Sequence, residues 1–132
     1  MVVHGTLYAT EKLELLARCR FGISACDREA FGIATAEMIQ AGLVTFVPGA
    51  GAQSEIVPMD DLIYDDIQEA ALKIDAVLKS DSRQLELHQG LLRRAMAFEP
   101  EHFCRAVRKL VEQELGVHRT NSTVRLNSAD VS

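Results

Sequence analysis

The stretch Glu29-Ala30-Phe31-Gly32-Ile33-Ala34-Thr35-Ala36-Glu37 lies between two predicted strands, and it decides the fold that we expect. The run from Phe21 to Cys26 comes before it and is predicted to be a strand. A helical run over Gly32 to Ala41 ends at Gly42, because glycine tolerates the left-handed conformation at a helix end. Leu43 to Val47 is almost entirely apolar, which is typical of a parallel strand covered on both faces. The order strand, helix, strand predicts a parallel sheet.

Further elements are expected on both sides of this unit. Thr10 is the expected N-cap of an earlier helix whose apolar face includes Leu13 and Leu16. Val2-Val3 has the character of a strand end, so the sheet would have three parallel strands, or four if Leu62 to Tyr64 forms a short last strand. The later elements are a helical turn at Ser54 to Val57, a short strand at Leu62 to Tyr64, and helices over about Asp66 to Leu78, Ser82 to Phe98 (capped by Asp81 or Ser82) and Pro100 to Gly116. The pattern predicts an α/β fold with right-handed crossovers and helices on both faces of the sheet.

Length and composition limit the class of protein. The chain has 132 residues, 48% of them hydrophobic, and a formal net charge of −5. We expect one domain over residues 1–116 and a flexible polar tail over 117–132. The negative charge argues against a nucleic-acid partner, because phosphate binding needs clustered Lys and Arg. No apolar run is long enough to span a bilayer and no signal-peptide pattern is present, so we expect a cytoplasmic protein.

Several residue types that could do chemistry are given structural roles. Cys19, Cys26 and Cys104 follow no metal-ligand spacing, so we predict no metal site. We expect these cysteines to be reduced and buried as small hydrophobic side chains. Phe31 is expected in the core, and His4 at a turn or on the surface.

Two carboxylates and several backbone amides give the opening stretch its chemistry. Glu29 lies where a strand ends and a helix begins, at the sheet edge where ligands bind in open α/β folds. The first amides of the helix, those of Gly32, Ile33 and Ala34, are free to meet an anion. Glu37, two turns further on, can accept hydrogen bonds from two adjacent hydroxyls, such as those of a ribose. Spacing alone is weak evidence, and solvated helix charges are the alternative interpretation.

These residues belong to a longer pattern. Glu29-Ala30-Phe31-Gly32 is followed by Ala36-Glu37-Met38, Ala41-Gly42, a strand, Gly49-Ala50-Gly51 and Glu55-Ile56-Val57. The order and approximate spacing resemble the donor-site region of retaining GT-B glycosyltransferases of the family-4 type. The pattern of that family is E-(G/A)-F-G, a second glutamate, A-x-G, a strand, a glycine-rich turn and E-I-V. The resemblance covers about Val2 to Leu115, and the successive late helices fit it too.

The resemblance implies a fold, a substrate and roles for particular residues. The fold would be a truncated Rossmann-like three-layer sandwich, the later half of the nucleotide-sugar-binding domain. Glu29 would be the catalytic residue beside the donor sugar, and Glu37 would bind the ribose. The donor would be a nucleotide sugar, such as a UDP- or GDP-sugar, transferred with retained configuration and without a further cofactor. The remaining contacts would come from the amides of Gly32, Ile33 and Ala34 and from the open loop that contains Gly49 and Gly51.

Parts of the family's machinery have no counterpart in these 132 residues. The family's Arg and Lys for the diphosphate come from a glycine-rich region that would precede Met1, and its acceptor-binding domain would also lie in a missing N-terminal half. We therefore expect a donor half-site that transfers no sugar on its own. The alternative is a non-catalytic module that forms a homodimer through the exposed sheet edge at Val2-Val3. A third interpretation keeps weak nucleotide binding without transfer.

Overall fold

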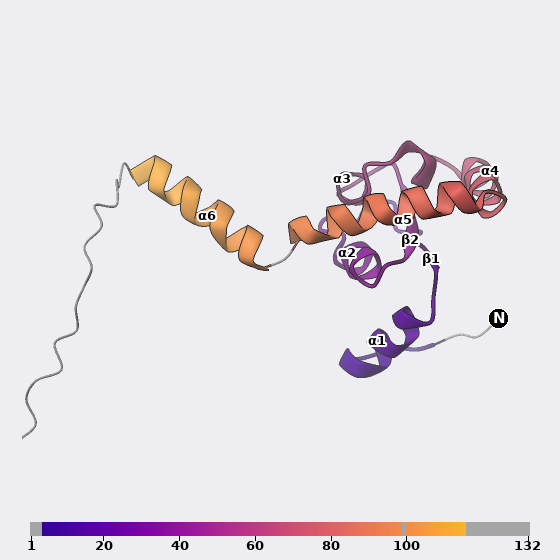
Figure 1. The fold of residues 1–132 in the computed structure, drawn as a ribbon, viewed down its shortest axis with the longest axis horizontal. Coiled ribbons are helices and arrows are strands. Elements are labelled where there is room, and N and C mark those ends of the chain that lie inside the picture. The colour runs from indigo at the N-terminus through magenta and orange to yellow at the C-terminus, as the bar shows by residue number, and fades with distance from the viewer. Residues whose placement is uncertain (1–3, 99, 116–132) are drawn as a thin grey trace, which may run out of the picture. The chain divides into compact units, whose positions relative to one another are not determined.

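The computed structural model describes residues 4–98 and 100–115 (Figure 1). The chain divides into two units, Met1–Glu99 and Pro100–Ser132. The first unit holds the sheet, and the described part of the second is one helix, α6 (Pro100–Leu115). The expected strand at Val2-Val3 and the expected tail over 117–132 lie outside the described residues.

Within the described residues, three parallel strands form the sheet, in the spatial order β1-β2-β3. β1 (Phe21–Ile23) pairs with β2 (Val44–Pro48), and β2 pairs with β3 (Ile63–Tyr64). The central strand β2 is buried along its whole length, as a parallel strand covered on both faces should be. The predicted α/β class and the parallel sheet are confirmed. β1 ends earlier than expected because the chain turns away after it, and the Cys26 carbonyl meets a side chain instead of a strand.

Six α-helices lie in the described residues, each close to a predicted position: α1 (Ala9–Ala17), α2 (Ile33–Gln40), α3 (Gln53–Ile56), α4 (Ile67–Leu78), α5 (Asp81–Ala95) and α6. Two predicted N-caps were wrong. Tyr8 precedes α1 without a capping side chain, and Thr10 lies inside the helix. Ser80 caps α5, because its backbone is extended and its hydroxyl accepts a hydrogen bond from the Arg83 amide at 3.3 Å. Within the described ranges, no helix combines the length and the apolar character needed to cross a bilayer.

The core of the first unit gathers around β2. Phe46 and Val47 of this strand pack in one cluster with Ile39 of α2, Val77 of α4 and Leu91 of α5, and none of the five is more than 2% exposed. Burial of each such side chain stabilises the fold by about 1.5–3 kcal/mol. The helices are therefore held by the strand whose carboxyl end leads into the predicted glycine loop.

Tyr64 of β3 connects the two outer strands across β2. Its hydroxyl donates a hydrogen bond to the backbone carbonyl of Ser24, directly after β1. Burial of the side chain raises the pKa of Tyr64 above its ordinary value, and the charge of Asp27 raises it further. The hydroxyl can donate only while it is protonated, so this connection belongs to the neutral tyrosine.

Tyr64→Phe should lower the free energy of unfolding at pH 7 by about 1 kcal/mol, because the Ser24 carbonyl loses its donor. A raised folded pKa stabilises the fold below the unfolded pKa, and this contribution is lost as pH rises through the folded value. The difference between wild type and Y64F should therefore shrink above about pH 10. Urea denaturation between pH 7 and 11 measures it, with Tyr8→Phe on a 72% exposed side chain as the control. A difference that stays constant with pH would contradict the raised pKa.

Candidate functional site

Two loops meet at the edge of the sheet where the strands end. One leads from β1 to α2 and contains Glu29, and the other leads from β2 to α3 and contains Gly49 and Gly51. They are joined by a hydrogen bond from the amide of Ala52 to the carbonyl oxygen of Glu29, at 3.1 Å. The structure therefore brings together the two loops in which the sequence predicted a site.

The carboxylate of Glu29 lies at the start of α2. Its Oε1 accepts hydrogen bonds from the amides of Phe31 and Gly32, both at 3.2 Å. A negative charge is favourable at this end of a helix, because the first amides have no partner inside the helix and the helix dipole is positive there. Glu29 therefore stabilises the beginning of α2, whatever else it does.

Gly32 connects this loop to α2 in a conformation that favours glycine. Its φ is 66°, and a Cβ atom here would lie 2.4 Å from Cδ1 of Ile56. The expectation that its amide is free was wrong, because Glu29 accepts a hydrogen bond from it. The amides of Ile33 and Ala34 donate no hydrogen bond within the described residues. Of the three predicted amides, two are therefore unpaired among the described residues.

The glycines of the second loop permit close contacts with other backbone and side-chain atoms. Gly51 has a φ of 87°, and a Cβ atom there would lie 2.8 Å from the carbonyl oxygen of Glu29. At Gly49 a Cβ atom would lie 2.4 Å from Oδ1 of Asp65, and the amide of Gly49 donates to the Tyr64 carbonyl at 2.9 Å. Gly51 is thus explained by its backbone conformation and its packing, whereas the atom nearest to a Cβ at Gly49 is the end of an exposed side chain that can move. The predicted ligand-binding role of both glycines stays a prediction.

A buried glutamine joins the elements of the site, and the sequence did not indicate it. Gln53, the first residue of α3, is 0% exposed. Its Oε1 accepts a hydrogen bond from Oγ1 of Thr35 in α2 at 2.7 Å, and its Nε2 donates to the carbonyl of Cys26 at 2.7 Å. Since glutamine is mostly exposed in proteins, its burial left no signal in the sequence other than its place after the glycine loop.

The second predicted carboxylate, Glu37, lies on α2 and pairs with a cation from α1. Its Oε1 lies 2.5 Å from Nζ of Lys12, and both side chains are about a third exposed. Such a partly exposed pair contributes little to stability. Lys12 was not a predicted site residue, and it places one positive charge beside the carboxylate that was expected to bind a ribose.

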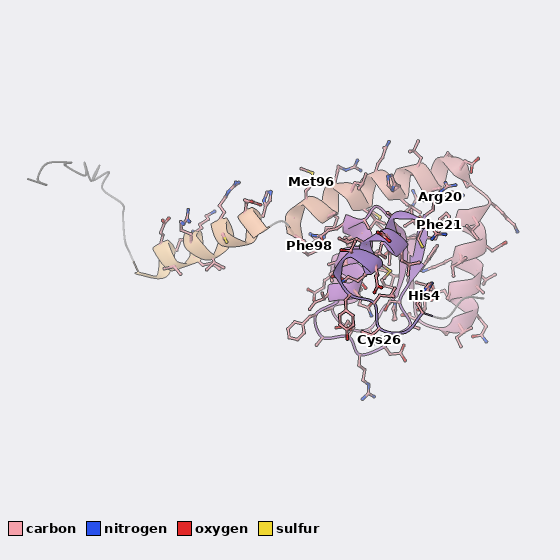
Figure 2. The ribbon with its side chains drawn as sticks, turned by 90° about the horizontal axis from the view of Figure 1, so that it is seen from below. His4, Arg20, Phe21, Cys26, Met96 and Phe98 are labelled. Atoms are coloured by element: carbon pink, nitrogen blue, oxygen red, sulfur yellow. The ribbon has the colours of Figure 1, made fainter. Side chains whose placement is uncertain are left out.

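A cavity of about 400 Å³ lies between α2, α3 and the end of α5. A larger cavity of about 520 Å³ lies at the opposite, amino ends of β1 and β2, where Arg20 and Phe21 lie side by side (Figure 2). None of the predicted site residues lines this larger cavity. The smaller cavity includes two of them, Ile33 and Glu37, and its lining also includes Phe31, Glu55, Arg94 and Phe98.

Two expectations about side-chain burial were wrong. Phe31 is 77% exposed, because the turn at Gly32 is packed on its inner side by Ile56 and Gln53, which leaves Phe31 on the wall of the smaller cavity. The three cysteines are exposed as well, since Cys19 and Cys26 lie in the segments that flank β1 and Cys104 lies on α6. In the described residues, no group of three or more His, Cys, Asp or Glu side chains could hold a metal ion.

Comparisons with known proteins add no relative: no family model matches the chain, and neither a curated protein nor a solved structure matches it.

Gly51→Ala should destabilise the protein by about 1–3 kcal/mol, because alanine is strained at a φ of 87° and its Cβ would collide with the Glu29 carbonyl. Gly5→Ala is the matched control, since no atom lies within 4 Å of its added Cβ. Thermal denaturation of both variants measures the difference. Equal stabilities would show that the two loops do not meet as described.

Proposed function

We propose that this chain is the later half of the nucleotide-sugar-binding domain of a retaining GT-B glycosyltransferase, and that it binds the donor without transferring the sugar by itself. The observation that supports this proposal most is the contact between the two loops at the carboxyl edge of the sheet. The loop of Glu29 and the loop of Gly51 come from different parts of the proposed family pattern, and a hydrogen bond joins them.

The strand order supports the same assignment. A Rossmann-like sheet has the order 3-2-1-4-5-6, so its last three strands are neighbours in the order of the sequence. The order β1-β2-β3 observed here is what strands four to six would give. A three-layer sandwich would be completed by the earlier strands, and we infer that they would pair with the outer edge of β1.

The chemistry of the proposed half-site follows from the groups at this edge. Glu29 would lie beside the donor sugar, and Glu37 would accept hydrogen bonds from the two ribose hydroxyls. The unpaired amides of Ile33 and Ala34 would donate to the diphosphate, whose negative charge increases as the bond to the sugar breaks. Since Glu37 is paired with Lys12, ribose binding would share or replace that ion pair.

Sugar transfer needs more than this half-site. The acceptor-binding domain and the basic diphosphate-binding residues of the family have no counterpart in these 132 residues. Charge stabilisation of the departing group is commonly the largest single contribution to catalysis of such reactions. We therefore infer binding without transfer for this chain alone.

A self-associating module is the second candidate, and the edge of the sheet favours it. In the described residues no strand pairs with the outer edge of β1. Beside that edge, Phe21, Ile23 and Leu78 line an apolar hollow of about 230 Å³. Unpaired edges of this kind favour association with another strand.

Calorimetric titration of the chain with UDP and with GDP tests the proposed function. At least one of them should bind, and Glu37→Gln should weaken that binding about tenfold, because hydrogen bonds to a charged acceptor are lost. The variant should also lose the preference for the ribose nucleotide over its 2′,3′-dideoxy analogue. Glu14→Gln, at an exposed position of α1, should change neither quantity.

Two results would contradict the proposal. One is a wild-type chain that binds neither nucleotide at millimolar concentration; if it also sediments as a dimer, the self-associating module is favoured. The other is an affinity that depends on Glu14 as strongly as on Glu37, which would indicate a general charge effect and no ribose contact.

A further inference from the structure

We propose that the cavity between α2, α3 and the end of α5 is an anion site, and that Arg94 binds the phosphate groups of the nucleotide there. The inference rests on the proposed function and adds to it a cation within the chain itself. No part of the sequence pattern pointed to Arg94, which lies in the last turn of α5.

Among the described residues, no carboxylate pairs with the charge of Arg94. The side chain is half-buried. Its Nε is buried and has no hydrogen-bond partner. It is the one buried side-chain nitrogen or oxygen without a partner among the described residues. Taking even part of a charged group out of water is unfavourable unless the group is paired. An anion in the cavity would supply the missing counterion.

Two contacts hold the guanidinium group in place. Its Nη2 donates to the backbone carbonyl of Glu55 at 2.7 Å, and its Cζ lies 5.2 Å from the centroid of the Phe98 ring. Phe98 stands at the end of the helical segment that follows α5 (Figure 2). A planar guanidinium group fixed by a carbonyl and a ring needs little reorganisation to bind a phosphate.

The rest of the lining fits the other parts of a nucleotide. Glu37 and Gln40 offer acceptors for hydroxyl groups, and the exposed side chains of Phe31 and Ile33 offer apolar surface for a ring. The cavity of about 400 Å³ is within the range of small-molecule sites. Glu55 also lines it, and its carboxylate would oppose an anion that lay close to it. The phosphate is therefore assigned to the part of the cavity at Arg94, and the sugar hydroxyls to the part at Glu37.

The test follows the side-chain Nε–Hε signal of Arg94 by NMR in the whole ¹⁵N-labelled chain. Pyrophosphate and UDP should move this signal, and uridine, which has no phosphate, should not. Arg94→Gln should weaken binding of pyrophosphate and of UDP at least about tenfold, because a charge-assisted hydrogen bond is lost. Arg93→Gln removes the neighbouring, exposed arginine and should leave both affinities unchanged. GDP replaces UDP throughout if GDP is the nucleotide that binds.

The outcomes separate this inference from the proposed function. If UDP binds and Arg94→Gln and wild type bind it equally, the role of Arg94 is overturned and the proposed function stands. If neither nucleotide binds wild type, both are overturned. If the Arg94 signal does not move when pyrophosphate is added to wild type, the anion site is overturned. This last result needs no variant, so it decides the matter even if Arg94→Gln fails to fold.

Discussion

The candidate site depends on two hydrogen bonds of the Gln53 side-chain amide. It is fully buried, accepts a hydrogen bond from the Thr35 hydroxyl and donates one to the Cys26 carbonyl, both at 2.7 Å. These two bonds connect α3, α2 and the loop after β1. If Gln53 were removed, the buried Thr35 hydroxyl would lose its partner, at a cost of about 1–3 kcal/mol, and the partly buried Cys26 carbonyl would lose its donor as well. The position of the two predicted loops therefore depends on one polar group within an apolar core.

Other features of the site follow from that arrangement. With α3 held against α2, Ile56 lies close to Gly32, whose φ of 66° favours glycine, and Gly51 lies against the backbone of Glu29. The same packing leaves Phe31 exposed beside Glu37 and Arg94, which forms the cavity to which we assign the phosphate. Glycines that the family pattern associates with an open cleft thus have a second role, because they let two loops and a helix come together.

The sequence predicted the regular parts well and the polar contacts poorly. β2 could be recognised because its residues are almost all apolar, and α4 because its apolar residues recur at helical spacing up to Leu78. Gln53 could not be recognised, since a glutamine after a glycine turn has the composition of an exposed loop. Arg94 was missed for a similar reason: an arginine in the last turn of a helix is usually explained by the helix dipole. In both cases the role depends on residues distant in the sequence.

Amide hydrogen exchange in Gln53→Leu tests most directly whether Gln53 holds the loops together. The amide of Ala52 donates to Glu29 and reports on the contact between the loops, whereas the amide of Gly49 donates to Tyr64 and reports on the sheet. Leucine is similar in size to glutamine, but its side chain can form neither of the two hydrogen bonds. We predict that Ala52 exchanges at least about tenfold faster in the variant while Gly49 keeps its protection, because only the loops are released. An unchanged Ala52 rate, or an equal acceleration at both amides, would contradict this account.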